Sequence, residues 1–369
     1  MFRFCDKNIL IISPESWGKS LLSKHHYALE LVARGNRVWF LNSPFHKKDE
    51  VAQLAEAHHT NLHILDEPIH KGLTKWPQWL QRIVIRHKVR RLLARAGVSF
   101  HAVWSFDNSR YFLLDEFTGA IKIHHVVDTH MNYSLREACS SANVCLAVTD
   151  ELVSRCAAYN TNAHFVQHGF APFSNTALTL HDRGYQTHAC YVGNLLMHAF
   201  DPTVIATLAN KFPAVCFHLI GNTYINHLST TIDPMRATQL EALRPLPNVV
   251  FYGELPYEEA FTLAAQCDVL LLMYFNKTEI IGNSSKLLTY LSTGKVILAD
   301  DLSGHQASHL LLSVQSREEY VSKFEHTIRN LAELNNKSNS SARKLFAEQH
   351  TYSKQVERIE TIISNTLAP

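Results

Sequence analysis

Long apolar runs are missing from this sequence of 369 residues. None approaches the roughly 20 residues that a helix needs to cross a bilayer, so we expect no transmembrane helix. The opening stretch, MFRFCDKNILIIS, has few apolar residues and no small-residue cleavage site, and we therefore expect no signal peptide. Internal repeats and low-complexity tracts are also missing, which argues against a repeat protein.

Paired cysteines are missing as well. The seven cysteines are odd in number and form no C-x-x-C pair, which argues against a disulfide framework or a zinc ribbon. We expect them to be small buried side chains in a reducing cytosol. They are Cys5, Cys139, Cys145, Cys156, Cys190, Cys216 and Cys267.

A large excess of one charge is the third absence. The 35 basic and 33 acidic residues leave a net charge of +2, which argues against a bulk nucleic-acid binder. The sum hides two unlike halves. Residues 1–168 carry 20 basic and 15 acidic residues, a net of +5, whereas residues 169–369 carry 15 and 18, a net of −3. The length suits two domains of roughly 150–200 residues each.

Apolar strands alternate with helical stretches through the first 168 residues. The unit of strand, helix and strand at the start is typical of a parallel sheet covered on both faces. A glycine, Gly35, follows the first helix, as a helix C-terminus favours. The expected strands are Asn8–Ile12, Arg37–Asn42, Leu62–Leu65, Ala102–Ser105, Ile121–Val127, Val144–Val148 and Ala163–Val166.

A polar stretch without periodicity, residues 169–186, is predicted to be an interdomain linker. A second series of strands with intervening helices follows within 187–350. The sequence therefore predicts two Rossmann-like, doubly wound domains that face a cleft, with ligands beyond the carboxyl ends of the strands. The expected strands are His188–Gly193, Val215–Gly221, Asn248–Gly253, Cys267–Phe275 and Val296–Asp300.

Five motifs in order give the second half a family resemblance. They are YVGN at 191–194, HLIGN at 218–222, LPNVVFYGELPYEE at 246–259, CDVLLLMYF at 267–275 and NSSKLLTYLSTGKVILADD at 283–301. Together they resemble the donor domain of GT-B glycosyltransferases. The likeness is greatest to bacterial enzymes of exopolysaccharide and cell-wall glycan synthesis, such as the glucuronosyltransferase of xanthan assembly. The resemblance also implies that a C-terminal helix, 351–369, packs back on the first domain.

A nucleotide diphosphate needs backbone N–H groups, a helix N-terminus and a cation. Asn283, Ser284 and Ser285 are expected to open a helix, and Lys286 lies in its first turn, where a cation is unfavourable unless an anion shares the place. A solvated lysine is the plain alternative. Gly193 permits close approach of a ligand, although an ordinary turn also favours glycine.

The resemblance adds further donor residues. It implies that Asn194 and Asn222 bind the donor, that Glu254 accepts hydrogen bonds from the ribose or base, and that Tyr274 packs nearby. Rim residues are the alternative for Glu254 and Tyr274. Retaining GT-B enzymes carry two glutamates eight positions apart, and here those places hold Ile281 and Thr289, with Glu279 off register. We therefore expect an inverting enzyme.

An inverting transfer requires a general base near the acceptor hydroxyl. Asp128 follows a predicted strand and is our candidate, with His125 or His130 orienting it or acting in its place. A helix cap is the alternative role for Asp128. We expect no metal in this cluster, because the adjacent His124 and His125 point to opposite faces of a strand. The resemblance to GT-B enzymes implies that protein groups neutralise the diphosphate, so no cofactor is expected.

Residues 13–20, SPESWGKS, resemble the end of a P-loop but have serine where its first glycine belongs. A kinase-like protein is therefore disfavoured. We expect this loop to line the cleft, with Trp17 and Lys19 near the acceptor.

Residues 68–106 contain eight basic residues and no acidic one. A basic helix with interfacial tryptophans is what an anionic membrane surface binds, whereas a core-packed helix with a solvated face is the alternative. Nucleic acid is disfavoured because no recognition motif accompanies the patch. The membrane candidates are Trp76, Trp79, Arg82, Arg86, Arg90 and Arg91.

These observations predict a metal-independent hexosyl- or glucuronosyltransferase that is peripheral on the inner face of the cell membrane. It would move a sugar from a nucleotide diphosphate sugar, UDP-linked by expectation, to a lipid-linked or glycan acceptor. A sugar-nucleotide 2-epimerase of the same fold and a non-catalytic sugar-nucleotide binder are the alternatives.

Overall fold

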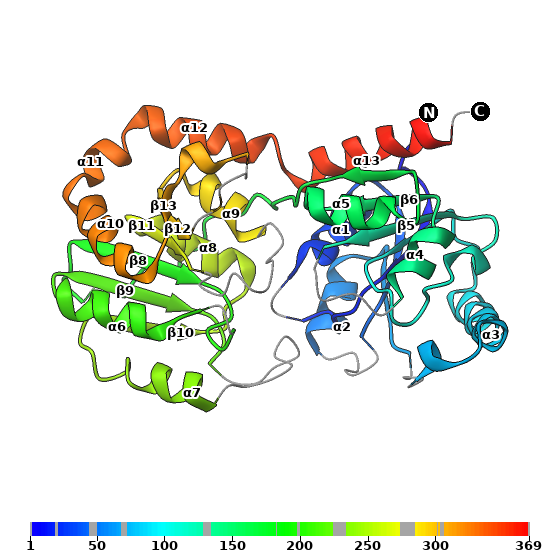
Figure 1. Cartoon of the computed structure of the whole chain (residues 1–369), viewed down its shortest axis with the longest axis horizontal. Coiled ribbons are helices and arrows are strands. Elements are labelled where there is room, and N and C mark those ends of the chain that lie inside the picture. The colour runs from blue at the N-terminus through cyan, green and yellow to red at the C-terminus, as the bar shows by residue number, and fades with distance from the viewer. Residues whose placement is uncertain are drawn as a thin grey trace. The chain divides into compact units, whose positions relative to one another are not determined.

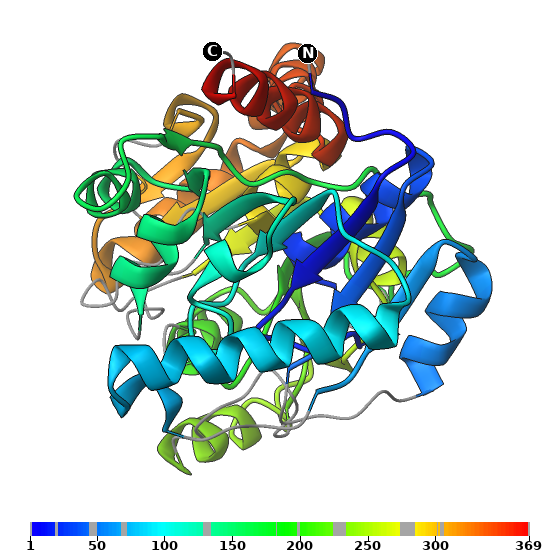
Figure 2. The ribbon, with the colours of Figure 1, turned by 90° about the vertical axis from the view of Figure 1, so that its right-hand side faces the viewer.

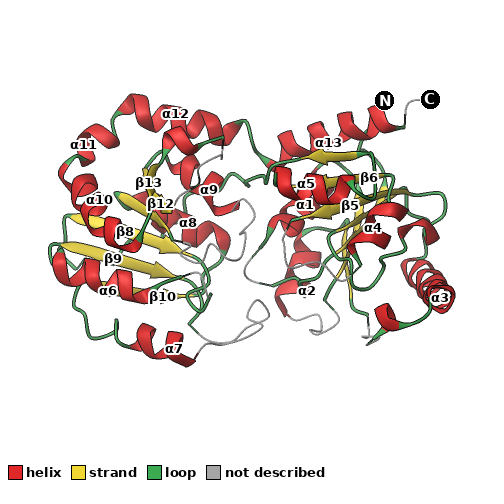
Figure 3. Cartoon of the chain, in the orientation of Figure 1, coloured by secondary structure: helices red, strands yellow, loops and turns green. Residues whose placement is uncertain are grey.

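Two parallel β-sheets organise the chain in the computed structural model, one in each of two compact units (Figure 1). Unit 1 comprises Met1–Gly169 and Tyr352–Pro369, and unit 2 comprises Phe170–Thr351. The structure describes residues 2–18, 21–43, 50–67, 72–127, 134–181, 183–197, 200–223, 234–273, 285–300, 302 and 306–367. Both sheets lie between helices (Figure 3), which confirms the predicted class of doubly wound α/β fold.

Unit 1 has a seven-stranded sheet in the order β3-β2-β1-β4-β5-β6-β7. Every neighbouring pair is parallel. The strands coincide with the predicted ones to within a residue, because most of them are short apolar runs buried on both faces. The edge strands β3 and β7 are less buried, and β7 has no buried residue. They are β1 (Asn8–Ile12), β2 (Arg37–Leu41), β3 (Leu62–Leu65), β4 (Ala102–Ser105), β5 (Ile121–Val126), β6 (Val144–Ala147) and β7 (Ala163–Phe165).

Helices connect these strands. The first ends as predicted, with Gly35 just beyond its last residues at φ 83°, a left-handed conformation that suits glycine. The helices of unit 1 are α1 (Ser23–Ala33), α2 (Glu50–His58), α3 (Gln78–Ala96), α4 (Leu135–Ser141), α5 (Asp150–Ala157) and α13 (Tyr352–Thr366), with short 3₁₀ helices η1 (Leu73–Lys75) and η2 (Leu114–Glu116).

Unit 2 has a six-stranded parallel sheet in the order β10-β9-β8-β11-β12-β13. Its last strand, β13, is three residues long and was not predicted. The strands are β8 (Thr187–Val192), β9 (Val215–Ile220), β10 (Val249–Gly253), β11 (Val269–Leu272), β12 (Val296–Asp300) and β13 (Leu312–Val314). The helices are α6 (Pro202–Lys211), α7 (Pro234–Glu241), α8 (Tyr257–Gln266), α9 (Ser285–Thr293), α10 (Arg317–Arg329), α11 (Leu331–Leu334) and α12 (Lys337–Glu348), with η3 (Ser308–Leu310).

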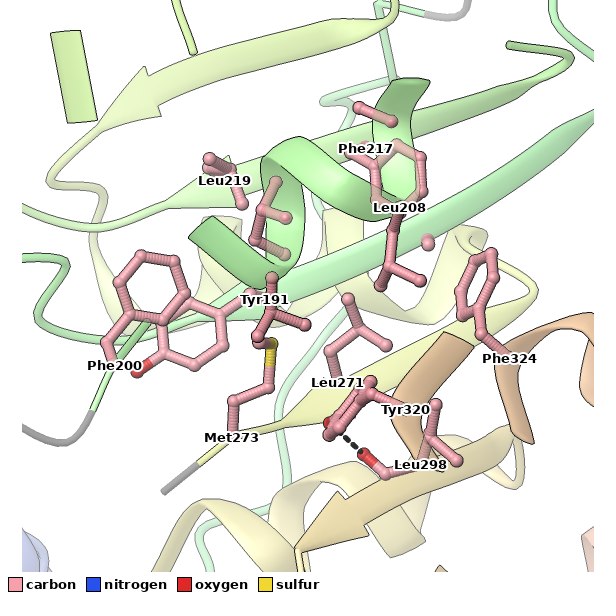
Figure 4. Close-up of a cluster of buried hydrophobic side chains, with 14 of the residues drawn as sticks. Tyr191, Phe200, Leu208, Phe217, Leu219, Leu271, Met273, Leu298, Tyr320 and Phe324 are labelled. Atoms are coloured by element: carbon pink, nitrogen blue, oxygen red, sulfur yellow. Dashed lines mark hydrogen bonds between the residues drawn. The ribbon is translucent and has the colours of Figure 1, made fainter. Parts of the chain in front are cut away.

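The core of unit 2 sets the position of its strand ends. Figure 4 shows one face of the sheet, where Tyr191 of β8 lies beside Phe200 and near Met273. The rings of Tyr191 and Phe200 have centroids 4.4 Å apart. Tyr320 of α10 belongs to the same buried cluster, and its hydroxyl donates a hydrogen bond to the carbonyl of Leu298 at 3.3 Å. The end of β8 is therefore held by packed aromatic rings.

The two ends of the chain meet in unit 1, where α13 lies next to the N-terminal residues (Figure 1). Glu360 of α13 is 2% exposed and accepts hydrogen bonds from the backbone N–H of Phe4 at 2.7 Å and from Arg3 at 2.9 Å. Arg34, at the end of α1, donates to the carbonyl of Ser353 at 2.8 Å. These contacts make α13 a structural part of unit 1.

The segment expected to be a linker, residues 169–186, lies along helix α8 for much of its length. The backbone N–H groups of Ser174, Thr176 and Leu180 donate to side chains of Glu258, Thr262 and Gln266. The acceptors recur every four residues, so they occupy one face of α8. Residues 174–180 are thus a packed part of unit 2.

Candidate functional site

A change in strand order marks one point on the sheet of unit 2. The chain runs outward from β8 through β9 to β10 and then returns to β11 on the other side of β8. In open α/β sheets, ligands bind beyond the carboxyl ends of the strands at such a point. Here the three strands on one side each end in glycine. Gly193 follows β8, Gly221 follows β9 and Gly253 ends β10.

These three residues form what we call the glycine ledge. The N–H of Gly193 donates to the carbonyl of Ile220 at 2.8 Å, and the N–H of Gly221 donates to the carbonyl of Gly253 at 2.8 Å. A Cβ atom on Gly221 would lie 1.7 Å from the carbonyl oxygen of Gly193, which only a backbone shift would relieve. Gly221 therefore has to be glycine, and the ledge brings bare backbone to the sheet edge.

Lys286 supplies a cation at this ledge. It is the second residue of α9, and its Nζ lies 4.8 Å from the centroid of the Tyr191 ring. A Cβ on Gly193 would come within 2.4 Å of that Nζ, so the amine lies against the Gly193 backbone. A cation over the face of an aromatic ring is attracted by the ring's quadrupole. Helix α9 begins at Ser285 and directs its first N–H groups outward from the same end. Together these groups favour an anion.

Other predicted donor residues lie on neighbouring strand ends. Asn194 is half-buried, and its side-chain oxygen accepts the backbone N–H of Leu196 at 3.0 Å, which shapes the turn after Gly193. Asn222 follows Gly221 and is 3% exposed. Glu254 follows Gly253 and is half-buried. The parallel order of β10, β9 and β8 places all three after adjacent strands.

Several predicted site residues fall outside the described residues. They are the proposed base Asp128 and the nearby His130, then Lys19 of the loop at 13–20, and the donor candidates Tyr274, Asn283 and Ser284. Glu279 and Ile281 also lie there.

Thr289 occupies the place where retaining relatives are expected to carry a glutamate. It is 3% exposed, and its hydroxyl lies 3.2 Å from the hydroxyl of Tyr257. The Tyr257 hydroxyl also donates to the carbonyl of Ala171 at 2.8 Å. Thr289 is therefore a packing and hydrogen-bonding residue inside unit 2.

In unit 1, His125 lies inside an aromatic cluster and is 1% exposed. Its ring stacks on Phe106, with centroids 5.0 Å apart, and its Nδ1 accepts a hydrogen bond from Trp104 at 3.4 Å. Burial, reinforced by the neighbouring His168, holds the pKa of His125 well below its ordinary value. The ring is thus neutral and closed off from solvent, so its place in the structure favours packing over proton transfer.

Trp17 is also enclosed in unit 1. It is 4% exposed and packs edge-on against Phe40 and His25, with centroids 4.9 Å and 5.2 Å away. Its backbone N–H donates to the side chain of Asn42 at 2.9 Å. These contacts anchor the loop after β1 in the core, and leave little of the indole exposed for an acceptor.

A buried ion pair, which the sequence analysis did not identify, joins the strand ends of unit 1. Arg110 is 7% exposed and donates to the Asp107 carboxylate at 2.6 Å, to the carbonyl of Asn42 at 2.7 Å and to the carbonyl of Ser13. Burial raises the pKa of Asp107, but the Arg110 charge and hydrogen bonds from Ser109 outweigh it, and the net pKa is lowered. The loops after β1, β2 and β4 are tied together by this guanidinium.

Helix α3 carries the basic stretch, and Figure 2 shows it along the side of unit 1 that faces the viewer. One face is buried through Ile85, Val89 and Leu92. The opposite side exposes Trp79 (65%) and Ile83 (55%). Trp76, just before the helix, is 48% exposed. The helix is thus packed on one face and presents large apolar side chains to solvent on the other.

The charges of α3 are partly neutralised within unit 1. Arg82 and Arg86 form ion pairs with Glu116 at 2.8 Å and 2.7 Å. The hydrogen bond from Arg86 is the largest influence on the pKa of the Glu116 carboxyl and lowers it. Burial raises this pKa, but the hydrogen bond from Arg82 lowers it again, so the net pKa is lowered. Arg90 and Arg91 are exposed, and neither has an acidic partner among the residues that the structure describes. No helix within the described ranges is long and apolar enough to cross a membrane.

The sequence placed Gly221 and Gly253 at strand ends but did not mark them, or the ring of Tyr191, as site residues. A signal for the glycines was present, because three consecutive strands end in the pattern of apolar residues followed by glycine. The contact of Tyr191 with Lys286 joins residues far apart in sequence, and no local pattern shows it.

No protein-family model and no curated protein sequence matches this chain. Solved structures do. Anabaena HepE in complex with UDP is 13% identical, with a TM-score of 0.65 over 97% of this chain and 100% of that one. The N-terminal domain of Candida albicans trehalose-6-phosphate phosphatase is 13% identical, with a TM-score of 0.66 over 98% and 99%. Arabidopsis thaliana UGT89C1 with UDP-L-rhamnose is 11% identical, with a TM-score of 0.56 over 97% and 99%.

These likenesses extend over almost the whole of each chain. At such low identity they show a shared fold, the GT-B fold, in agreement with the resemblance in the sequence. Fold alone does not establish an activity, so the function has to be argued from the site.

Proposed function

We propose that this protein is a glycosyltransferase that takes its sugar from a UDP-sugar. The observation that carries the proposal is the Lys286 amine, held against the Gly193 backbone at the strand-order change of a GT-B donor unit. Negative charge develops on a leaving diphosphate, and a cation and the first N–H groups of a helix stabilise that charge. The solved structures of HepE with UDP and of UGT89C1 with UDP-L-rhamnose support a uridine nucleotide.

In this proposal the transfer inverts the anomeric carbon. Asp128 removes the proton of the acceptor hydroxyl while the oxygen of that hydroxyl forms a bond to the anomeric carbon. The bond from that carbon to the diphosphate oxygen breaks, and its electron pair leaves with UDP. Thr289 supports this course, because a buried threonine stands where a retaining enzyme is expected to carry glutamate. Lys286 and the start of α9 neutralise the diphosphate, so the transfer itself requires no metal.

The proposed acceptor is a lipid-linked or glycan molecule in the synthesis of cell-surface polysaccharide. Exposed Trp76, Trp79 and Ile83 together with Arg90 and Arg91 support docking of α3 on an anionic membrane. The enzyme would then act on the cytoplasmic face, where both UDP-sugars and lipid-linked intermediates meet it. The ion pairs of Arg82 and Arg86 make these two residues structural in the proposal.

A nucleotide and donor screen tests the proposal. Unfolding temperature is measured with UDP, ADP and GDP, and then release of UDP is followed with a panel of UDP-sugars and membrane extract. UDP should stabilise the protein by about 2.7 kcal/mol at a hundredfold excess over its dissociation constant. No stabilisation by UDP would contradict the proposal. Conversion of a UDP-sugar without any acceptor would instead identify a 2-epimerase, and binding without turnover a sugar-nucleotide binder.

A further inference from the structure

Three metal-ligating side chains meet at the amino-terminal edge of the unit 2 sheet. His188 lies on β8, and Cys216 and His218 lie on β9. Their ligand atoms are all within 4.8 Å of one another, and Nδ1 of His188 is 3.0 Å from Nε2 of His218. Strand register explains the meeting. His188 pairs directly with Cys216, and His218 is two residues further along the same face of β9.

We propose that His188, Cys216 and His218 bind a zinc ion, with a water molecule as the fourth ligand. Two imidazole nitrogens and one thiolate are ligands that zinc takes in tetrahedral sites. Zinc–ligand bond lengths place neighbouring ligand atoms roughly 3.3–3.6 Å apart in such a site. The observed separations, from 3.0 Å to at most 4.8 Å, bracket these values. Small rotations of the two rings bring the three atoms to one ion.

The groups around the cluster orient its rings. The hydroxyl of Tyr252 lies 3.0 Å from Nδ1 of His218 and also accepts the backbone N–H of His181 at 2.9 Å. With zinc on Nε2, the Nδ1–H of His218 donates to Tyr252, which is the usual arrangement of a metal-bound histidine. The carboxylate of Asp268 accepts the backbone N–H of His188 at 2.9 Å and adds negative charge beside the ion.

Burial differs among the three side chains. Cys216 and His218 are fully buried, while the half-buried His188 leaves a path for the ion. Zinc takes neutral imidazole and thiolate as ligands. The Cys216 thiol gives its proton to solvent when zinc binds.

The site stands apart from the proposed transfer. Gly193 lies five residues after His188 along the extended chain of β8, about 16 Å away at the usual rise per residue. Zinc at His188 would hold β8 to β9 at one edge of the sheet, while the donor binds at the other. Its role in this inference is structural, and it leaves the metal-independent transfer unchanged.

A chain of hydrogen bonds from His188 through His218 to Tyr252 would account for the same contacts without an ion. A measurement of metal binding distinguishes this explanation from a zinc site. The full chain is purified as Cys5→Ser, because Cys5 is the exposed cysteine, and is stripped with chelator. Zn²⁺ is then titrated, and Co²⁺ is used as a spectroscopic probe. We expect one tight zinc per chain, a thiolate-to-cobalt charge-transfer band, and the intense visible bands of tetrahedral cobalt.

Variants identify the ligands. In the same background, His188→Gln and Cys216→Ser should abolish tight zinc binding and the charge-transfer band. Cys190→Ser, a change of the thiol register-paired with His218, should leave both unchanged. Tyr252→Phe should weaken zinc binding roughly 10–100-fold, as loss of an orienting hydrogen bond does. UDP binding by His188→Gln should equal that of the parent, which keeps this test independent of the transferase proposal.

Folding of each variant is checked by circular dichroism, and the half-buried position of His188 makes His188→Gln the mildest change. Absence of tight zinc binding in the parent would overturn the inference. Equal zinc binding in the parent, His188→Gln and Cys216→Ser would overturn it as well, as would loss of binding in Cys190→Ser alone.

Discussion

The side-chain amine of Lys286 lies 4.8 Å from the centre of the Tyr191 ring. That ring is fully buried and is fixed in turn against Phe200. The amine is thus positioned by the hydrophobic core, and it reaches the strand end where Gly193 has no side chain to obstruct it. A preorganised cation stabilises developing negative charge without reorganisation.

Removing this cation should weaken nucleotide binding. We expect Lys286→Met to bind UDP roughly 10–150-fold more weakly, because a hydrogen bond to a charged group contributes about 1.5–3 kcal/mol. Calorimetric titration with UDP measures the effect. Lys295→Met is the matched control, because Lys295 follows the opposite end of α9. Equal UDP affinity of Lys286→Met and the parent would remove Lys286 from the donor site.

The glycine ledge should tolerate a methyl group at Gly253 far better than at Gly221. Gly221→Ala is expected to cost at least about 3 kcal/mol of unfolding free energy, because its Cβ would meet the Gly193 carbonyl oxygen. Gly253 has a left-handed backbone, φ 72°, whereas Gly221 has φ 149°, and no atom lies within 4 Å of a Cβ built on Gly253. Gly253→Ala should cost only about 1–2 kcal/mol. Urea unfolding compares them, and equal costs would count against the close approach.

Substitution of the proposed base separates catalysis from capping. Asp128→Asn keeps an oxygen able to cap a helix but cannot take a proton. We expect kcat to fall roughly 10²–10⁴-fold with little change in unfolding temperature. Asp150→Asn, at an exposed acidic residue of α5, is the control. An unchanged kcat in Asp128→Asn would exclude Asp128 as the base.

Helix α3 should bind anionic vesicles through Arg90, Arg91 and its exposed rings. Arg90→Glu with Arg91→Glu should reduce binding at least about 30-fold, since each lost surface cation contributes about 1 kcal/mol. Trp79→Ser should also weaken it. Co-sedimentation with vesicles of anionic and of neutral lipid measures both effects. Lys337→Glu with Lys344→Glu makes the same change of charge on exposed residues of α12 and should bind like the parent. Unaltered binding after the α3 changes would refute docking by this helix.

Acid should destabilise unit 1 through buried histidines. Burial lowers the pKa of His26 to about 4, so the folded state keeps it neutral while the unfolded chain takes up a proton near pH 6.5. The stabilisation is complete above about pH 6.5 and is lost as the pH falls towards 4. His26→Phe keeps a ring against Tyr352 and should reduce the loss between about pH 7.5 and pH 5 by about 2 kcal/mol.

Urea unfolding at the two pH values measures this difference. His87→Phe, the same change at an exposed histidine, is the control. An acid loss in His26→Phe as large as in the parent would show that other groups dominate.

Most strands could be predicted because each is a local apolar run, such as Asn8–Ile12 or Val296–Asp300. The exception is β13, which has three residues, only one of them buried. The packing of the segment at 169–186 could not be predicted from its sequence either. Its polar composition indicated a linker, yet its N–H groups are satisfied by side chains of α8, a helix some 80 residues later in the chain.

The basic stretch shows why charge in sequence differs from charge on a surface. No acidic residue occurs within 68–106, but Glu116, just beyond it, pairs with both Arg82 and Arg86. His125 shows the same for a candidate catalyst. The sequence places it near the end of the predicted strand Ile121–Val127, and only the packing of Phe106 and Trp104 around its ring reveals that it is enclosed.

The sequence by itself determined the two doubly wound sheets, their strand positions and the glycines at the strand ends, because apolar periodicity and turn preferences are local. Tertiary structure decided which side chains meet. Lys286 reaches Tyr191, and His188 reaches His218, only because parallel pairing aligns strand ends that are distant in the chain. Such contacts depend on register and on the packing of helices over the sheet, and neither is encoded in any short stretch of residues.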